Sequence, residues 1–501
     1  MQADAGRVTD PPDPRADGSR AGVSSRRMRS AHLCICAAAL AACGGSPSGA
    51  CDDDACGTTC ADSDSDCGST TTSPTTTSSP ETTMSATSAD TSSTDPMPTA
   101  TTVDPDDSSS TGFPNPECRD DSECDAAEPI CSTGTCVPCS EAPEPDAACN
   151  SLNPDAPLCV GDACVQCDAD DQTVCTGTVP ICDVATNTCI GCSAHEQCPA
   201  SACHFDEGSC LPDDVVFWVD GDAGDCLGAD GSMALPYCTI GEAVDQIGQA
   251  SRGTIRIVAT GAPYGEAIEI DGNRVVALLG DGPELPAWFG IAAPTLTVDS
   301  ATVFAHRIGW RSNALDPAVA LDDATMWIDR SEIVLNQGGG VELVAGSVLH
   351  LRTSVIGAGG SGLADRQALR VDGSMIDVVA STIAGNDSSM MSSIRCLGGG
   401  GGSVRSSIVV GLDPPSVSCL GLEVDDSAID TEGLGGSGNV ELDAFNAGWF
   451  VDAAGGDFHL VDGTLFEDLG VWHDGDPAVD LDGDARPNRD GAPDVAGADV
   501  P

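Results

Sequence analysis

The chain has 501 residues, which is too many for one ordinary hydrophobic core, so we expect several segments with different structures. Its formal net charge is −59, and all 20 basic residues are Arg. So acidic a chain repels nucleic acid and anionic lipid headgroups, which excludes both as expected partners. Aromatic residues make up only 3% of the chain, which argues against broad stacking platforms for sugars.

The N-terminal part resembles an export signal. Residues 1–27 resemble neither a signal nor a domain, and we expect that Met28 is the true start. Arg29 and the apolar run Ala31–Ala42 follow, so residues 28–42 have the charged and apolar regions of a signal peptide. The apolar run is too short for a transmembrane helix.

This signal ends in Leu40-Ala41-Ala42-Cys43-Gly44, which resembles the lipobox of bacterial lipoproteins. The resemblance implies cleavage before Cys43 and a diacylglycerol on its thiol. Gly44, in the place where Asp would retain a lipoprotein, is consistent with sorting to the outer membrane. We therefore expect a lipid-anchored protein of the cell outer membrane, facing the exterior or the periplasm, that touches the membrane only through its anchor.

Two short segments follow the anchor. Residues 43–67 are a Cys-rich N-terminus, in which the four Cys after Cys43 lie among many Asp; we expect two local disulfides, with a calcium site as the alternative. Residues 68–117 consist mostly of Ser, Thr, Pro and Asp, and they cannot bury enough apolar surface to offset the entropy of ordering. They predict a disordered stalk between the anchor and the folded part.

Residues 118–212 contain sixteen Cys in repeated units. Each of three units has a Pro-(Ile/Leu)-Cys sequence and then Cys-x-x-Cys, ending at Cys139, Cys167 and Cys192. Zinc would also use Cys-x-x-Cys pairs, but His195 and His204 lie outside zinc-finger spacing, and export oxidises thiols. Because a region with so small a core needs covalent staples, the repeats predict disulfides.

Residues 213–475 predict stacked β-coils. Five segments align on Ile308, Ile333, Ile356, Ile383 and Ile408, at spacings of 25, 23, 27 and 25 residues. Ser331, Ser354, Ser381 and Ser406 precede four of these Ile by two positions. Repeats of this length, rich in β-branched residues and turn formers, are typical of a solenoid whose like side chains stack about 4.8 Å apart.

The segment before these coils predicts a strand at Val216–Asp220, an amphipathic helix from Ile240 to Ile247 capped by Thr239, and a strand at Thr254–Val258. This segment contains Pro236-Tyr237-Cys238-Thr239-Ile240. As a whole it is similar to the start of right-handed parallel β-helix domains of the pectate-lyase-like superfamily. The resemblance implies an all-β fold: a right-handed parallel β-helix solenoid with an N-terminal capping helix, preceded here by the disulfide-rich repeats and the disordered stalk.

Two Cys pairs fall within this part. Cys226 and Cys238 flank the turn that leads to the capping helix, and Cys396 and Cys419 lie about one coil apart, so both pairs are disulfide candidates.

Residues 476–501 form an Asp/Gly-rich tail, similar to the closing segment of bacterial β-helix surface proteins. Asp480, Asp482 and Asp484 are candidate calcium ligands, although their order lacks the Gly and the distal Glu of an EF-hand loop. No other cofactor or metal is expected.

The superfamily contains polysaccharide lyases and glycosidases as well as proteins without activity, so the fold does not decide whether this chain is an enzyme. A lyase needs a basic residue and cations or Arg that neutralise the sugar carboxylate, and a glycosidase needs two carboxyl groups facing one cleft. The candidates by position are Arg307, Arg330, Arg352, Arg405, Asp322, Asp323, Asp329, Asp372, Asp377, His306 and His350. They form no known catalytic motif, so we assign no catalytic residue.

The sequence therefore favours a surface lipoprotein whose β-helix binds or adheres to a polysaccharide or another cell-surface ligand, or supports the envelope. The alternative is a tethered carbohydrate-active enzyme, a polysaccharide lyase or a glycoside hydrolase, on the same scaffold.

Overall fold

The computed structural model describes residues 117–501, apart from 126, 172, 225, 249, 291–292, 358, 360–366, 386–391 and 413–414. The expectations for the start at Met28, the signal 28–42, the lipidation at Cys43, the segment 43–67 and nearly all of the stalk lie outside the described residues. Within the part described, no helix is long and apolar enough to cross a membrane.

Residues 118–210 form four small disulfide modules. In each module the first Cys is bonded to the third and the second to the fourth. The bonds are Cys118–Cys131, Cys124–Cys136, Cys139–Cys159, Cys149–Cys164, Cys167–Cys182, Cys175–Cys189, Cys192–Cys203 and Cys198–Cys210. Each Cys-x-x-Cys sequence therefore joins the last Cys of one module to the first Cys of the next.

Every module contains a short antiparallel hairpin that brings its third and fourth Cys together. The hairpins are β1 (Ile130–Ser132) with β2 (Thr135–Val137), β3 (Leu158–Val160) with β4 (Ala163–Val165), β5 (Ile181–Asp183) with β6 (Thr188–Ile190), and β7 (Cys203–His204) with β8 (Ser209–Cys210). The helical pieces are η1 (Asp121–Glu123), η2 (Cys139–Glu141), α1 (Pro145–Leu152) and η3 (His195–Gln197). The small cores consist largely of the buried Cys themselves, which is why the modules need the disulfides.

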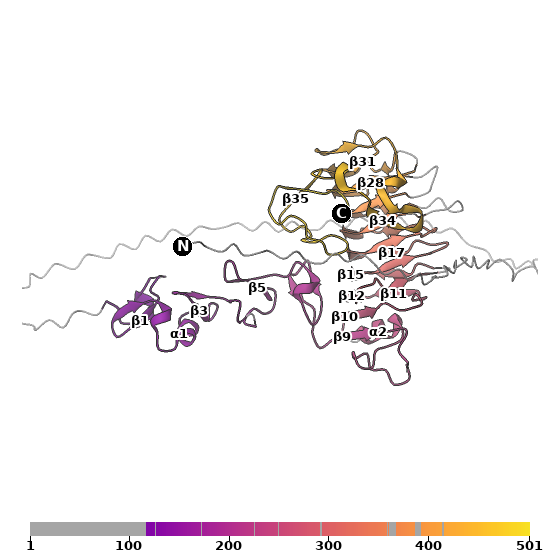
Figure 1. Ribbon diagram of the computed structural model, residues 1–501. Helices are drawn as coiled ribbons and strands as arrows, with labels where there is room; N and C mark the ends of the chain where they lie inside the picture. Colours follow the sequence, from indigo (N-terminus) through magenta and orange to yellow (C-terminus); the bar gives the residue numbers. More distant parts are fainter. Residues whose placement is uncertain are drawn as a thin grey trace, which may run out of the picture. The chain divides into compact units, whose positions relative to one another are not determined.

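A parallel β-solenoid of three sheets follows, as predicted (Figure 1). Sheet 1 contains β9 (Val216–Val219), β10 (Arg252–Val258), β12 (Val275–Asp281), β15 (Thr302–His306), β18 (Thr325–Asp329), β21 (Val348–Arg352), β24 (Met375–Val379), β27 (Gly401–Arg405) and β30 (Gly421–Asp425). Sheet 2 contains β11 (Ile268–Asp271), β14 (Leu296–Asp299), β17 (Val319–Asp322), β20 (Val341–Val344), β23 (Leu369–Asp372), β26 (Ile394–Leu397) and β29 (Val417–Ser418). Sheet 3 contains β13 (Ala287–Trp288), β16 (Gly309–Arg311), β19 (Glu332–Val334), β22 (Val355–Gly357), β25 (Thr382–Ala384), β28 (Ile408–Val410), β31 (Ala428–Ile429) and β32 (Val440–Glu441).

The Ile column exists, but two of the five aligned segments are out of register. Ile333, Ile356 and Ile383 stack on one another as predicted. The next residue in the column is Val409 instead of Ile408, and the preceding one is Trp310 instead of Ile308. Aligning the segments by Ile failed at these two coils because the interior position also accepts other apolar side chains, here Trp and Val.

A column of buried Ser runs along the turns between sheets 1 and 3. The amide of each Ser donates to the hydroxyl of the next Ser in the column: Ser331 to Ser354 at 3.0 Å, Ser354 to Ser381 at 3.2 Å and Ser381 to Ser407 at 3.1 Å. The column therefore continues through Ser407 and not through Ser406. Ser406 instead precedes it with a positive φ and bonds to the backbone of Val471 in the C-terminal segment.

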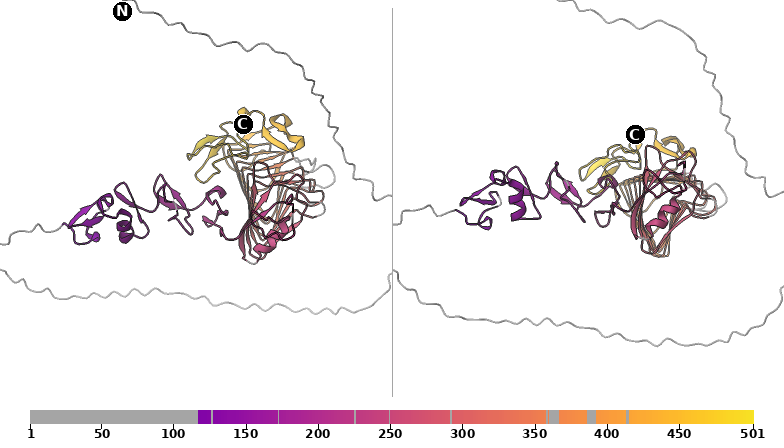
Figure 2. Two further views of the ribbon diagram at one scale, coloured as in Figure 1. Left: turned by 60° about the horizontal axis from the view of Figure 1, so that its bottom comes forward. Right: turned by 90° about the horizontal axis from the view of Figure 1, so that it is seen from below.

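The helix α2 (Ile240–Ile247) closes the end of the stack next to β9, and the right view of Figure 2 looks at this end. Thr239 caps it by accepting from the amide of Glu242, as its position in the sequence predicted. The face formed by Ile240, Ala243, Val244 and Ile247 joins the main core. The cap covers apolar side chains that would otherwise meet water.

The parallel strands end with β32, and the rest of the chain folds back over the outer face of sheet 3. It contains β33 (Phe450–Asp452), β34 (Asp457–Leu460), β35 (Gly470–Trp472) and β36 (Ala492–Asp494), with short turns of 3-10 helix at Ala447–Trp449, Ala453–Gly455 and Gly463–Leu465. Phe450, Phe458 and Phe466 pack there against Val355 and Ile408 of the sheet. The parallel stack is thus shorter than the segment 213–475 that the sequence indicated.

Candidate functional site

The outer face of sheet 1 carries a row of polar side chains. In β15, β18 and β21 alternate residues point into the core, so the other residues face outward. The strand register places His306, Asp329 and Arg352 side by side in consecutive coils. Of the sequence candidates, these three are therefore brought together by the stacking of the coils.

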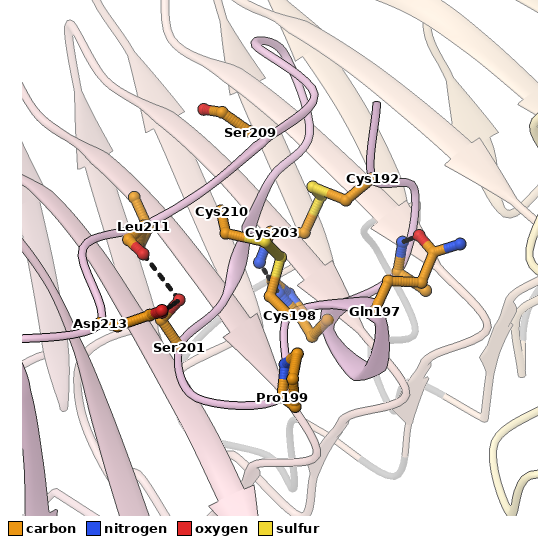
Figure 3. Close-up of a disulfide and its surroundings, with 12 residues drawn as sticks. Cys192, Gln197, Cys198, Pro199, Ser201, Cys203, Ser209, Cys210, Leu211 and Asp213 are labelled. Carbon is orange, nitrogen blue, oxygen red and sulfur yellow. Dashed lines mark hydrogen bonds between the residues drawn. A yellow bond between two sulfur atoms is a disulfide. The ribbon is translucent and has the colours of Figure 1, made fainter. Parts of the chain in front are cut away.

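The fourth disulfide module, residues 192–210, is packed on this face (Figure 3). Ala202, Phe205 and Leu211 contact the outward residues Leu279 and Phe304 of the sheet. The contact is apolar in its middle and polar at its edge. Glu196 of the module lies at that edge, where sequence analysis had indicated no functional residue.

An ion cluster joins the module to the sheet. Nδ1 of His306 lies 2.8 Å from a carboxylate oxygen of Asp329, and its Nε2 lies 3.3 Å from Glu196. The same Glu196 oxygen is 3.3 Å from a guanidinium nitrogen of Arg330. His306, which is buried, is therefore held between two carboxylates that lie 133 positions apart in the chain (196 and 329).

The ionisation of the cluster follows from these contacts. Hydrogen bonding to His306 lowers the pKa of Glu196 to about 2. Burial alone would raise the pKa of Asp329, but its hydrogen bond to His306 and the nearby positive charges lower it to about 2. Burial alone would lower the pKa of His306, and the two carboxylates raise it overall. Each group thus favours the charged form of its neighbours.

His195 lies beside this cluster and has the opposite preference. Its side chain is buried, and its ring centroid is 5.3 Å from that of His306. Burial, followed by the charge of His306, lowers its pKa to about 3, so it is neutral near neutral pH. Nδ1 accepts from the amide of Cys203 at 3.1 Å, which places the proton on Nε2. That buried N–H has no hydrogen-bond partner among the described residues.

Two cavities lie on either side of the contact. The first, of about 330 Å³, is lined by Ser193, Ala194, Glu196, Phe205, Asp329, Arg330, Arg352, Asp476, Pro477, Ala478, Val479 and Gly483. The second, of about 350 Å³, is lined by His195, Glu196, Cys198, Pro199, Arg256, Leu279, Gly280, Asp281, His306, Arg307 and Arg330. Because both are lined by Glu196 and Arg330, we call them together the arginine cleft, after Arg256, Arg307, Arg330 and Arg352.

The C-terminal segment forms the far wall of the first cavity. Arg405 is paired with Asp476, Arg352 donates to the carbonyl of Gly475, and Arg330 donates to that of Leu481. The wall is thus held by three Arg that lie at or just after the ends of β18, β21 and β27 of sheet 1. Of the four Arg that the sequence indicated, Arg405 is neutralised by Asp476, whereas Arg307, Arg330 and Arg352 line the cleft.

Two guanidinium groups of the cleft have no carboxylate partner within the described part of the chain. Arg307 donates to the carbonyl oxygens of Gly282 and Pro283, at 2.7 and 3.0 Å. Arg352 lies over the rings of Phe205 and Trp327, 5.3 and 5.7 Å from their centroids. Burial and the neighbouring charge of Arg330 lower the pKa of Arg307. Both charges thus remain available to an anionic group.

The other sequence candidates lie elsewhere. Asp377 accepts from Ser403 and pairs with His350, whose ring stacks on Trp327. Asp322, Asp323 and Asp372 lie where strands of sheet 2 end, and none of the three lines the arginine cleft. Cys226 is bonded to Cys238, and Cys396 to Cys419.

The three candidate calcium ligands do not converge. Asp480 is fully buried, and one of its oxygens accepts from the amides of Asp482, Gly483 and Asp484 while the other accepts from that of Val500. Its carboxylate therefore shapes the turn. Asp482 lies instead near His459 and Asp499.

A family model described as a family of unknown function (DUF8331) matches residues 104–216, which include the disulfide modules. No curated protein matches the chain significantly. A solved structure titled as the crystal structure of pectate lyase Pel9A is similar to this chain, with 13% sequence identity and a TM-score of 0.24, covering 56% of this chain and 95% of the other.

Proposed function

We propose that this protein is a lipid-anchored surface protein whose arginine cleft binds an acidic glycan. The observation that carries the proposal is the pair Arg307 and Arg352, whose guanidinium groups form no ion pair with a carboxylate of the described residues although the chain has a net charge of −59. In so acidic a chain, unpaired cations that line cavities are the groups that an anionic ligand would neutralise.

The lining suits a sugar that carries a carboxylate. Guanidinium groups bind carboxylates through paired N–H donors, and the N–H of His195 adds a further donor. Glu196 and Asp329 offer acceptors for hydroxyl groups, and Phe205 offers an apolar surface for a ring face. The two volumes lie at the lower end of the range of about 300–1,000 Å³ that is usual for ligand pockets. Each therefore suits one sugar unit rather than a long chain.

Replacing either Arg307 or Arg352 with Ala is expected to weaken binding to polygalacturonate by about 10-fold or more, because each removes a charge-assisted hydrogen bond worth about 1.5–3 kcal/mol. The full chain would be co-sedimented with polygalacturonate, alginate and dextran. Binding is expected only for the acidic polymers, and it should weaken as the salt concentration rises.

Arg489→Ala is the matched control, since Arg489 is exposed and lines neither cavity. It removes the same charge and should leave binding within about twofold of the native protein, as surface changes usually do. If all three variants lose binding equally, net charge alone explains the effect. The absence of binding by the native chain would refute the cleft as a glycan site.

The alternative is a polysaccharide lyase, which the placement of Arg307 beside Arg256 and Arg330 in the second cavity favours, because a lyase combines a base with cations that neutralise the sugar carboxylate. In that reaction Arg307 would take the C5 proton of a uronate, Arg256 and Arg330 would neutralise its carboxylate, and the bond from C4 to the glycosidic oxygen would break. A C4–C5 double bond forms, and the departing oxygen takes up a proton. Ultraviolet absorbance of the unsaturated product in the same incubations decides between the two.

Hydrolysis has less support. A glycosidase needs one protonated carboxyl group near neutral pH, and the pKa values of Glu196 and Asp329 are both lowered to about 2. Both carboxylates also bind His306 rather than face each other across a substrate.

The anchor part of the proposal rests on the lipobox that ends at Cys43, outside the described residues. Cys43→Ser removes the thiol that would carry the lipid, so the protein should move from the membrane fraction to the soluble fraction. Cys51→Ser serves as the control and should stay with the membranes. A Cys43→Ser protein that still sediments with membranes would disprove lipid anchoring.

A further inference from the structure

A second polar cluster lies outside the arginine cleft, where the hairpin β33–β34 meets the end of the chain. It consists of His459 on β34, Asp482 in the turn held by Asp480, and Asp499 near the C-terminus. One ligand atom from each residue can be chosen so that all three atoms lie within 4.8 Å of one another. The three residues come from separate segments, so no sequence spacing reveals the group.

The imidazole is oriented as in a metal site. Nδ1 of His459 lies 2.6 Å from a carboxylate oxygen of Asp457, two residues earlier on the same strand. Metal-bound His residues usually make such a bond through the nitrogen that does not bind the metal. The other nitrogen, Nε2, is buried and forms no hydrogen bond of acceptable geometry with any described residue.

The two carboxylates complete the group. Asp482 has an oxygen 3.1 Å from Nε2 of His459 and is largely exposed, so a cation can reach it from solvent. Asp499 is buried, and one of its oxygens accepts from the amide of Leu460 at 2.6 Å, which fixes the carboxylate beside the hairpin. The cluster thus combines one buried, positioned ligand with one that can move.

We propose that His459, Asp482 and Asp499 form a divalent transition-metal site, with Zn²⁺ as the matching ion and Asp457 as a positioning residue. One imidazole nitrogen and two carboxylate oxygens are ligands that Zn²⁺ accepts at about 2.0–2.2 Å, whereas Ca²⁺ takes six to eight oxygens. The metal-free cluster is an imidazole between carboxylates, and the metal takes the place of its Nε2 proton. Three protein ligands leave an open position for water.

Binding at this site would tie three segments together. The hairpin, the turn 480–484 and the C-terminal residues all lie against the outer face of sheet 3. Since the ion contacts a ligand in each of them, it binds the folded state more strongly than the unfolded one, and it should raise the temperature of unfolding.

The test is calorimetric titration of Zn²⁺ into the full chain, with its disulfides formed and any free thiols alkylated. Excess Mg²⁺ and Ca²⁺ are included, because a net charge of −59 attracts divalent cations weakly at many places. We expect one saturable site in the native chain, at least 10-fold weaker in Asp457→Asn and lost in His459→Ala and in Asp482→Asn. Zn²⁺ should raise the melting temperature of the native chain but not that of His459→Ala or Asp482→Asn.

His473→Ala is the matched control, because His473 also pairs with an Asp, Asp490, but lies outside the group. It should bind Zn²⁺ as the native chain does. Asp482 is exposed, so Asp482→Asn keeps the test informative if His459→Ala fails to fold. Saturable binding that is unchanged in Asp482→Asn, or no saturable binding by the native chain, would overturn the proposal.

Discussion

Replacing Arg486 with Met is expected to lower the free energy of unfolding by about 3–5 kcal/mol, the usual cost of leaving one partner of a buried ion pair without the other. The side chain of Arg486 is 0% exposed and that of Asp494 is 4% exposed, and their closest atoms are 2.9 Å apart. Arg486 also donates to the carbonyl oxygens of Val495 and Gly497. Loss of these contacts would release the C-terminal segment that forms one wall of the arginine cleft.

Urea denaturation of three variants measures this effect. Arg489→Met makes the same replacement at an exposed position and should change stability by less than about 0.5 kcal/mol. Adding Asp494→Asn to Arg486→Met should recover part of the lost stability, because neither member of the buried pair then carries a charge. The introduced Asn side chain can still accept from the amide of Val495. If Arg486→Met unfolds at the same urea concentration as Arg489→Met, the pair has no structural role.

Replacing His306 with Gln is expected to weaken the docking of the fourth disulfide module by about 3 kcal/mol, because Asp329 keeps a buried charge without its partner. The module is closed by its own disulfides, so it should separate from sheet 1 without unfolding. Hydrogen exchange of the module amides, followed by mass spectrometry, reports this opening directly.

The same contact should depend on pH in two ways. The pKa of His306 is raised, so its contribution is complete below about pH 6.5 and is lost as the pH rises through the raised value. The pKa of His195 is lowered to about 3, so its contribution is complete above pH 6.5 and is lost as the pH falls toward 3. The contributions of Glu196 and Asp329 are also lost in acid, on approach to about pH 2. Docking should therefore be strongest near pH 6.5.

Variants distinguish the loss of docking at high pH from the loss at low pH. His306→Gln should abolish the loss at high pH, and His195→Asn, which keeps an acceptor for the amide of Cys203, should reduce the loss at low pH. His473→Gln changes an exposed His outside the contact and should preserve both limbs. A profile with the same alkaline limb in His306→Gln would show that another group controls docking.

Much of the local structure could be predicted from residue patterns. The helix Ile240–Ile247 and its cap follow from apolar spacing and from the hydroxyl of Thr239, which act within one turn. The repeated Cys units indicated disulfides, but not their connectivity, because the connectivity depends on which Cys the short hairpins bring together.

Register could be predicted only in part. Ile333, Ile356 and Ile383 stack as expected, yet the flanking coils contribute Trp310 and Val409. The interior accepts any apolar side chain of suitable volume, whereas the Ser column depends on hydrogen bonds that require one position in every turn. Ser407 fits that position and Ser406 does not.

The sequence by itself determined the stacked coils, the capping helix and the oxidised Cys, because each depends on contacts within one repeat or between neighbouring repeats. It also indicated Arg307, Arg330, Arg352 and Arg405 as candidates by their positions in the aligned coils. Only the tertiary structure decided what faces them. Arg330 bonds Glu196 and the carbonyl of Leu481 across 134 and 151 positions, and His459 meets Asp499 across 40. A repeat predicts its neighbours along the stack, but the segments that dock on its outer face follow no period.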